Sequence, residues 1–146
     1  MELGLPASVH GDLARRATPV AVGAGLAASA AFIATHNPAS PGSLYPTCAF
    51  HQATGLWCPG CGLTRGAYQL FHGHIGAALG YNIFTPVAIA AIVVVWLGWV
   101  RVSWGAPPWR VPPHTARWLA IITPTLLLIY GVLRNLPVAP LRALAP

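Results

Sequence analysis

The chain has 146 residues, of which 55% are hydrophobic and only 7% are charged, and its mean hydropathy is +0.62. A typical soluble domain carries charge on about a quarter of its residues, so this chain has too few polar groups to cover a globular surface in water. The net charge of +6 comes from eight arginines and two acids, but the arginines lie at the ends of apolar runs and form no clustered basic face. The composition therefore predicts a membrane protein and argues against nucleic-acid binding.

Three apolar runs, at about residues 18–35, 84–103 and 117–134, have lengths that suit membrane-spanning helices. The first run has a rival interpretation as a cleaved secretory signal, because Arg15-Arg16, an apolar core and Ala28-Ser29-Ala30 fit that outline. It continues past this site to Ala34, which favours a retained helix. The fold class predicted is all-α integral membrane, with about three transmembrane helices in a single membrane domain over residues 1–146.

The arginines also predict an orientation, since cytoplasmic loops carry an excess of positive charge. With a cytoplasmic N-terminus, the inside holds Arg15, Arg16, Arg101, Arg110 and Arg117, and the outside holds Arg65, Arg134 and Arg142. We therefore expect a multi-pass protein of the cell (inner or plasma) membrane. The loop at residues 45–82 then faces the extracytoplasmic side, where disulfides persist.

The loop at residues 45–82 is rich in cysteine, and we expect it to be partly helical. Apolar residues recur at helical spacing from Leu63 onward, which predicts a short helix over about residues 63–72, ended by Gly73 as a C-cap. A second short helical piece is expected over 75–79. Neither piece is long enough to span a bilayer, so we expect one or two interfacial helices.

Cys58 and Cys61 have the two-residue spacing that redox pairs and metal-binding turns share. Proline and glycine between them favour the turn that brings two thiols together. The helix expected from Leu63 places Cys61 near a helix N-terminus, and Arg65 adds positive charge one turn further on. Both features stabilise a thiolate, so we expect a lowered pKa for this pair.

Cys48 makes the number of cysteines odd and leaves three interpretations open. Cys48 pairs with Cys58 or Cys61 in a structural disulfide, or the three thiols bind a metal, or Cys58 and Cys61 are a working redox pair with Cys48 as a relay thiol. The metal would be zinc, and the candidates for its fourth ligand are His51, His72 and His74.

Thr64 and Arg65 have two interpretations of their own. Free N–H groups at a helix start together with one arginine make an anion site that suits a phosphate or a phospholipid headgroup. The simpler interpretation, which we favour, is that Thr64 caps the helix and Arg65 anchors it in the headgroup layer.

The central region resembles a widespread family of small bacterial membrane proteins, domain-of-unknown-function family 2752. The resemblance covers roughly residues 45–100 and depends on Cys48, the run Thr54-Gly55-Leu56-Trp57-Cys58-Pro59-Gly60-Cys61-Gly62-Leu63-Thr64-Arg65, Gly73, Ala77-Ala78 and Asn82. The family usually opens the next helix with Asn-Pro, whereas Ile83 follows Asn82 here and the proline comes at Pro86. The resemblance implies a membrane location and a shared purpose for Cys48, Cys58, Cys61, Thr64 and Arg65, and no established activity.

Outside the arginines the chain has almost no acid–base groups, and neither the apolar runs nor the loop contains a carboxylate. General acid–base catalysis would have to rely on histidines alone. We therefore expect a non-enzymatic accessory or scaffold protein, whose cysteine loop is held rigid by a disulfide or a metal and binds lipid, a membrane-protein partner or a second copy. The alternative is an enzyme, a membrane thiol–disulfide oxidoreductase that uses Cys58 and Cys61 as its catalytic residues.

Overall fold

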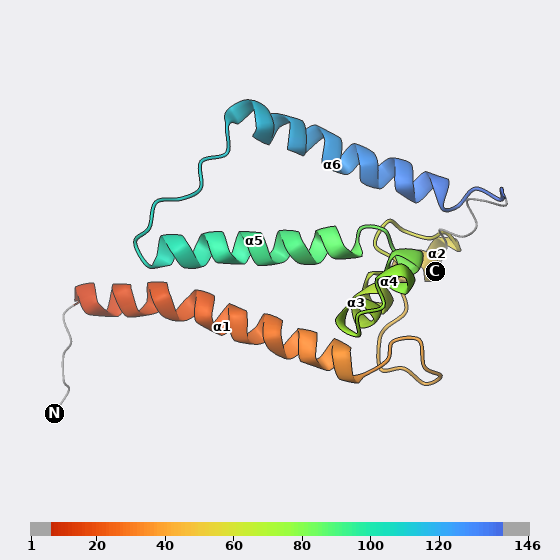
Figure 1. The fold of residues 1–146 in the computed structure, drawn as a ribbon, viewed down its shortest axis with the longest axis horizontal. Coiled ribbons are helices and arrows are strands. Elements are labelled where there is room, and N and C mark those ends of the chain that lie inside the picture. Colours follow the sequence, from red (N-terminus) through yellow and green to blue (C-terminus); the bar gives the residue numbers. More distant parts are fainter. Residues whose placement is uncertain (1–6, 139–146) are drawn as a thin grey trace. The chain divides into compact units, whose positions relative to one another are not determined.

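The computed structural model describes residues 7–138, and in this part the chain forms helices joined by loops, without a strand (Figure 1). Its elements in chain order are α1 (Ala7–Thr35), α2 (Ala49–Thr54), α3 (Leu63–Phe71), α4 (Ile75–Tyr81), α5 (Thr85–Ser103) and α6 (Pro113–Leu133). The helices expected over 63–72 and 75–79 are confirmed as α3 and α4. Between them lies Gly73, whose φ of 77° is a left-handed conformation that glycine adopts without strain.

Three helices are long and apolar enough to cross a membrane, as expected. They are Asp12–Thr35, with 24 residues, Thr85–Ser103, with 19, and Pro113–Leu133, with 21, and their mean hydropathies are 1.7, 1.9 and 1.7. Their apolar side chains are largely exposed; Val95 keeps 72% of its surface and Leu128 keeps 70%. Such surfaces are stable in hydrocarbon and costly in water, so these helices fit a lipid bilayer.

Two of the three helices begin earlier than the apolar pattern predicts. The first, expected from about residue 18, belongs to a helix that starts at Ala7, so Pro19 lies inside α1. The third, expected from about residue 117, starts at Pro113, because a proline at the first helical position loses no intrahelical hydrogen bond. Hydropathy shows which part of a helix is apolar, and the backbone hydrogen bonds of these two helices begin before that part.

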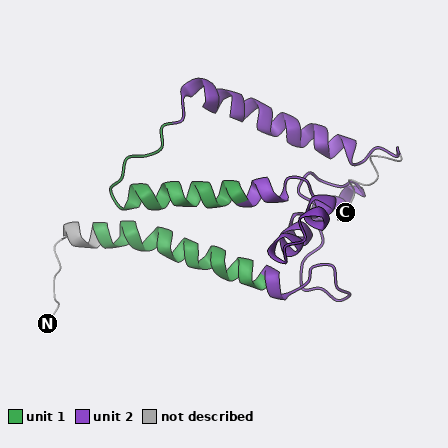
Figure 2. Cartoon of the chain, in the orientation of Figure 1, with its two compact units in different colours: residues 1–32, 90–110 green, residues 33–89, 111–146 purple. Residues whose placement is uncertain are grey.

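The described residues fall into two compact units (Figure 2). The first contains residues up to 32 and 90–110, and the second contains residues 33–89 and those from 111 onward. In the first unit, the indole Nε1 of Trp96 donates to the carbonyl oxygen of Pro19 at 2.9 Å. The same indole packs on Gly23, where an added Cβ would lie 2.5 Å from the ring. Gly23 therefore provides the space that lets α1 and α5 approach each other here.

In the second unit, α3 and α4 pack closely around small residues. Ala78 has no exposed surface, and a Cβ added at Gly66 would lie 2.4 Å from the hydroxyl oxygen of Thr85 and 3.0 Å from the carbonyl oxygen of Ala78. A side chain at residue 66 would therefore force these segments apart. The close packing joins α3 and α4 to the start of α5.

Candidate functional site

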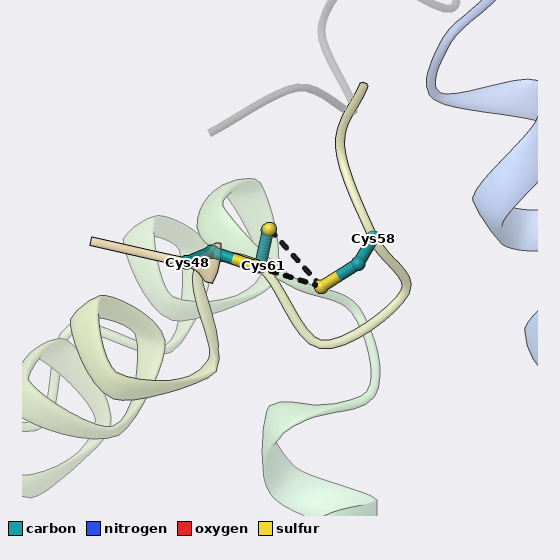
Figure 3. Close-up of side chains that lie close together, drawn as sticks. All are labelled: Cys48, Cys58 and Cys61. Carbon is teal, nitrogen blue, oxygen red and sulfur yellow. Dashed lines mark hydrogen bonds between the residues drawn. The ribbon is translucent and has the colours of Figure 1, made fainter. Parts of the chain in front are cut away.

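The three cysteines converge in the second unit (Figure 3). Cys58 is the central residue, because its Sγ lies 3.1 Å from the Sγ of Cys61 and 3.5 Å from the Sγ of Cys48. All three sulfur atoms lie within 4.8 Å of one another, and all three thiols are free. We call Cys48, Cys58 and Cys61 the cysteine cluster. Three sulfurs at this spacing are close enough to bind one metal ion or to exchange a disulfide bond.

Local backbone structure presents each sulfur to the cluster. Cys48 is the N-cap residue of α2 and has extended dihedrals, with φ −60° and ψ 120°. Cys58 and Cys61 lie on a tight turn in which the N–H of Cys61 donates to the carbonyl oxygen of Cys58 at 3.0 Å. Gly62 follows with a φ of 86° and is the N-cap of α3. Only glycine adopts this conformation without strain, which explains a glycine directly after the second cysteine.

Asn82 binds the cysteine turn through its side-chain amide. Its Nδ2 donates to the carbonyl oxygens of Pro59 at 2.8 Å and Cys61 at 3.0 Å. Its Oδ1 accepts a hydrogen bond from the N–H of Phe84 at 2.9 Å, and the residue has no exposed surface. The amide therefore joins the turn to the residues that lead into α5.

Arg134, at the end of α6, binds the same turn. Its Nη1 donates to the carbonyl oxygens of Cys58 at 3.1 Å and Cys61 at 3.0 Å. The side chain is 1% exposed, and its guanidinium carbon lies 4.9 Å from the ring centroid of Tyr130. We expected Arg134 only as a charge beside a membrane span, so its burial against the cysteine turn is a finding of the structure.

Asn135 extends this support by one residue. It pairs with the backbone of Trp57, accepting from the Trp57 N–H at 2.8 Å and donating to the Trp57 carbonyl oxygen at 2.8 Å. Close by, Pro59 packs on Gly131 of α6, where an added Cβ would lie 3.1 Å from the Cγ of Pro59. The cysteine turn is thus tied to α6 by side-chain hydrogen bonds and by direct backbone packing.

The environment moves the pKa values of two thiols in opposite directions. Hydrogen bonding from the backbone of His51, with the neighbouring Cys61 and Cys58 thiols, lowers the pKa of Cys48 from 9.0 to about 7. Burial, followed by the hydrogen bonds from Cys58 and Cys48, raises the pKa of Cys61 to about 12. This differs from the expected lowered pKa at Cys61. Burial of its sulfur outweighs the nearby start of α3, and the helix that favours a thiolate is α2, at Cys48.

The imidazole side chains of the predicted zinc ligands do not join the cluster. No imidazole nitrogen of the described residues joins the three sulfurs. His51 stacks on Trp57 with ring centroids 3.8 Å apart, the Nδ1 of His72 lies 2.8 Å from the Tyr68 carbonyl oxygen, and the Nδ1 of His74 lies 3.0 Å from the Gln69 side chain.

Thr64 and Arg65 are half-buried in the first turn of α3. Gly62 occupies the N-cap position, and no side-chain capping hydrogen bond is present there. The expectation that Thr64 caps this helix was therefore wrong. Their role as binding residues stays a prediction.

An apolar groove runs along the side of the cysteine turn, with a volume of about 390 Å³. One wall comes from the loop and the other from α6, and its lining consists of Phe50, Leu56, Trp57, Cys58, Pro59, Leu128, Gly131, Val132, Asn135 and Leu136. The sulfur-bearing Cys58 therefore borders an apolar surface that continues onto the exposed face of α6 at Leu128 and Val132.

Sequence reasoning missed Arg134, Asn135 and Tyr130 as supports of the cluster. Asn82 belonged to the family pattern, but no role followed from that pattern. The sequence signal for these supports was the pair Arg134-Asn135 directly after an apolar run. The same pattern is typical of polar residues that flank any membrane-spanning helix, so it did not indicate a buried role.

No curated protein and no solved structure matches the chain. Residues 48–96 match a family described as "Protein of unknown function (DUF2752)", a segment that contains the cysteine cluster and Asn82 and ends within α5. The family resemblance expected from the cysteine motif is therefore confirmed over residues 48–96.

Proposed function

We propose that this chain is a multi-pass membrane accessory protein whose cysteine loop is held rigid by a zinc ion bound to Cys48, Cys58 and Cys61. The observation that carries the proposal is the convergence of all three sulfur atoms within 4.8 Å. A structural disulfide needs only two of these sulfurs. The third sulfur would then lie close to the disulfide without being bonded to either of its sulfurs, whereas a metal ion would bind all three.

The sulfur spacing supports metal binding quantitatively. Zinc–sulfur bonds of about 2.3 Å in a tetrahedral arrangement place neighbouring sulfurs about 3.8 Å apart. Cys58 lies 3.1 Å from Cys61 and 3.5 Å from Cys48, so movements of less than about 1 Å would reach that geometry. Structural zinc sites have four protein ligands, and three of them are cysteines in one common set, so the fourth ligand here would be a group from outside the cluster.

The surroundings of the cluster support a scaffold role. Asn82, Arg134 and Asn135 all bind backbone atoms of the cysteine turn, which makes the turn rigid and leaves the groove beside it open. The apolar groove suits a lipid or an apolar segment of a membrane partner. With a cytoplasmic N-terminus, as the arginine pattern predicts, this surface faces the extracytoplasmic side.

The test is a metal and thiol analysis of detergent-purified protein. We expect about one zinc ion per chain by elemental analysis, and thiols that react with maleimide only after a chelator is added. Thiols that become reactive only after a reductant is added would show a disulfide and contradict the zinc proposal. Three thiols that react without either treatment would also contradict it.

A second candidate function is thiol–disulfide exchange with a partner protein, and the 3.1 Å separation of Cys58 and Cys61 favours it. In this reaction the oxidised Cys58–Cys61 pair accepts two electrons and two protons from a partner dithiol, and the partner leaves with a disulfide. Cys48, 3.5 Å from Cys58, would act as the relay thiol. A Cys48→Ser variant that accumulates a mixed disulfide with a partner would support this function, and cells without such a species would argue against it.

A further inference from the structure

We propose that Arg134 is the counter-ion of the metal centre: its guanidinium neutralises the single negative charge of a zinc ion bound by three cysteine thiolates. This inference rests on the proposed zinc site and adds a named charge partner to it. Arg134 binds the carbonyl oxygens of Cys58 and Cys61 and not their sulfurs, so it is a positioning residue that acts through the backbone of the ligand residues.

The burial of Arg134 is the first observation. The guanidinium is charged at any physiological pH, yet the side chain is only 1% exposed. Nη1 has two carbonyl acceptors, while the buried Nε and Nη2 have no hydrogen-bond partner among the described residues. A buried cation with incomplete hydrogen bonding is costly unless a negative charge lies nearby.

The second unit has no acidic side chain for this purpose. The only acids of the chain are Glu2 and Asp12, and the sequence from residue 13 to the end contains none. The face of the Tyr130 ring lies under the guanidinium and contributes a partial negative charge, which is far less than a full one. The unit that contains Arg134 therefore has a buried positive charge and no acidic residue to balance it.

The cysteine cluster can supply the missing charge. Zinc carries +2 and three thiolates carry −3, so the centre has a net charge of −1, which the +1 of Arg134 balances. The contacts are in the right place, because Arg134 binds the carbonyl oxygens of Cys58 and Cys61, two of the three ligand residues. Groups that bind the ligand residues of a metal in this way commonly tune its affinity.

Asn82 provides an internal comparison. Its amide donates to the same Cys61 carbonyl oxygen at 3.0 Å, and it is as deeply buried as Arg134. The two side chains therefore make the same kind of hydrogen bond to the cysteine turn, and they differ in charge. Charge is thus the property that Arg134 adds.

The experiment measures zinc affinity in the full-length protein, by competition with a chromophoric chelator. Arg134→Gln keeps an amide donor and removes the charge, and we expect it to weaken zinc binding by about 10- to 100-fold. Arg134→Lys keeps the charge and should recover most of that loss. The control is Arg117→Gln, an exposed arginine at the other end of α6, which should bind zinc like the wild type. The sulfur-to-cobalt charge-transfer bands of the cobalt-substituted protein report whether three thiolates still bind the ion.

The outcomes separate the two claims. A wild-type protein that binds no zinc overturns the proposed function. A wild type that binds zinc, with an Arg134→Gln variant of equal affinity, overturns only the counter-ion. An Arg134→Lys variant as weak as Arg134→Gln also overturns it, because the geometry of the guanidinium would then matter and its charge would not. If Arg134→Gln does not fold, the lysine variant decides: affinity within about tenfold of the wild type supports the proposal, and a larger loss contradicts it.

Discussion

The two units of the chain are held together by different means. In the first, α1 and α5 meet through the indole hydrogen bond of Trp96, a hydrogen bond from the Arg15 guanidinium to the Val102 carbonyl oxygen, and a glycine that admits the indole. Most other side chains there are exposed and apolar. In the second, three buried or half-buried side chains, Asn82, Arg134 and Asn135, bind the backbone of one short turn. Many different apolar residues could form the first kind of surface, because lipid contacts them without requiring particular hydrogen bonds. The second kind requires particular donors at particular places, which is what a chemical site needs.

The largest expected effect is on the cluster itself. Cys58→Ser removes the central sulfur, so the zinc content should fall from about one ion per chain to background. His72→Ala is the matched control, because His72 lies outside the cluster and bonds to the Tyr68 carbonyl oxygen. Elemental analysis of both variants measures the difference. Loss of zinc in His72→Ala would show that this histidine is the fourth ligand after all.

A smaller but still large effect is expected at Asn82. Asn82→Leu removes both hydrogen bonds to the cysteine turn and leaves the Pro59 carbonyl oxygen without its donor, so stability should fall by about 1–3 kcal/mol. Thermal unfolding in detergent measures it. Asn37→Ala is the control, since its side chain is exposed and bonds only to the nearby N–H of Ala39. Equal melting temperatures for the Asn82 variant and the wild type would mean that the turn does not depend on this amide.

In the first unit, Gly23→Leu should destabilise the packing of α1 on Trp96 by about 1–3 kcal/mol, because the added side chain meets the indole. Gly25→Leu is the control, since nothing lies within 4 Å of a Cβ at that position. Thermal unfolding reports stability, and the zinc content should stay at the wild-type level in both variants. A Gly23 variant that unfolds like the Gly25 variant would contradict the packing described for this unit.

The smallest effect concerns the thiols of the reduced, metal-free protein. The pKa of Cys48 is lowered to about 7, so its alkylation rate should rise with pH and reach half its maximum near pH 7. The pKa of Cys61 is raised to about 12, so Cys61 should remain protonated and unreactive through the neutral range. Mass mapping of iodoacetamide adducts between pH 5 and about 9 distinguishes the two. Modification of Cys61 before Cys48 would reverse this assignment.

Much of the fold followed from local patterns. The three long helices and the helices α3 and α4 were predicted, because hydropathy and turn residues act over a few positions. Gly73 was expected as the C-cap of α3, but His72 has that position and Gly73 follows it with a positive φ. Helix starts were less accurate, since polar residues before Pro19 and around Pro113 continue the backbone hydrogen bonding without adding hydrophobicity. The predicted pKa of Cys61 was wrong because burial, which depends on the tertiary structure, outweighs the helix start that the sequence reveals.

The sequence by itself determined the class of protein and the chemistry of its central turn. Composition and apolar runs indicate lipid as the solvent, and Cys58-Pro59-Gly60-Cys61 brings two thiols together on one turn. Only the tertiary structure decided that Cys48 joins the other two cysteines and that the predicted histidine ligands do not. It also decided that Arg134 is buried against the carbonyl oxygens of Cys61 and Cys58, which lie 73 and 76 residues earlier in the chain. The reason is physical. Residue spacing and hydropathy determine local structure between neighbours in the sequence, whereas the role of a buried charge depends on the distant groups that packing brings beside it.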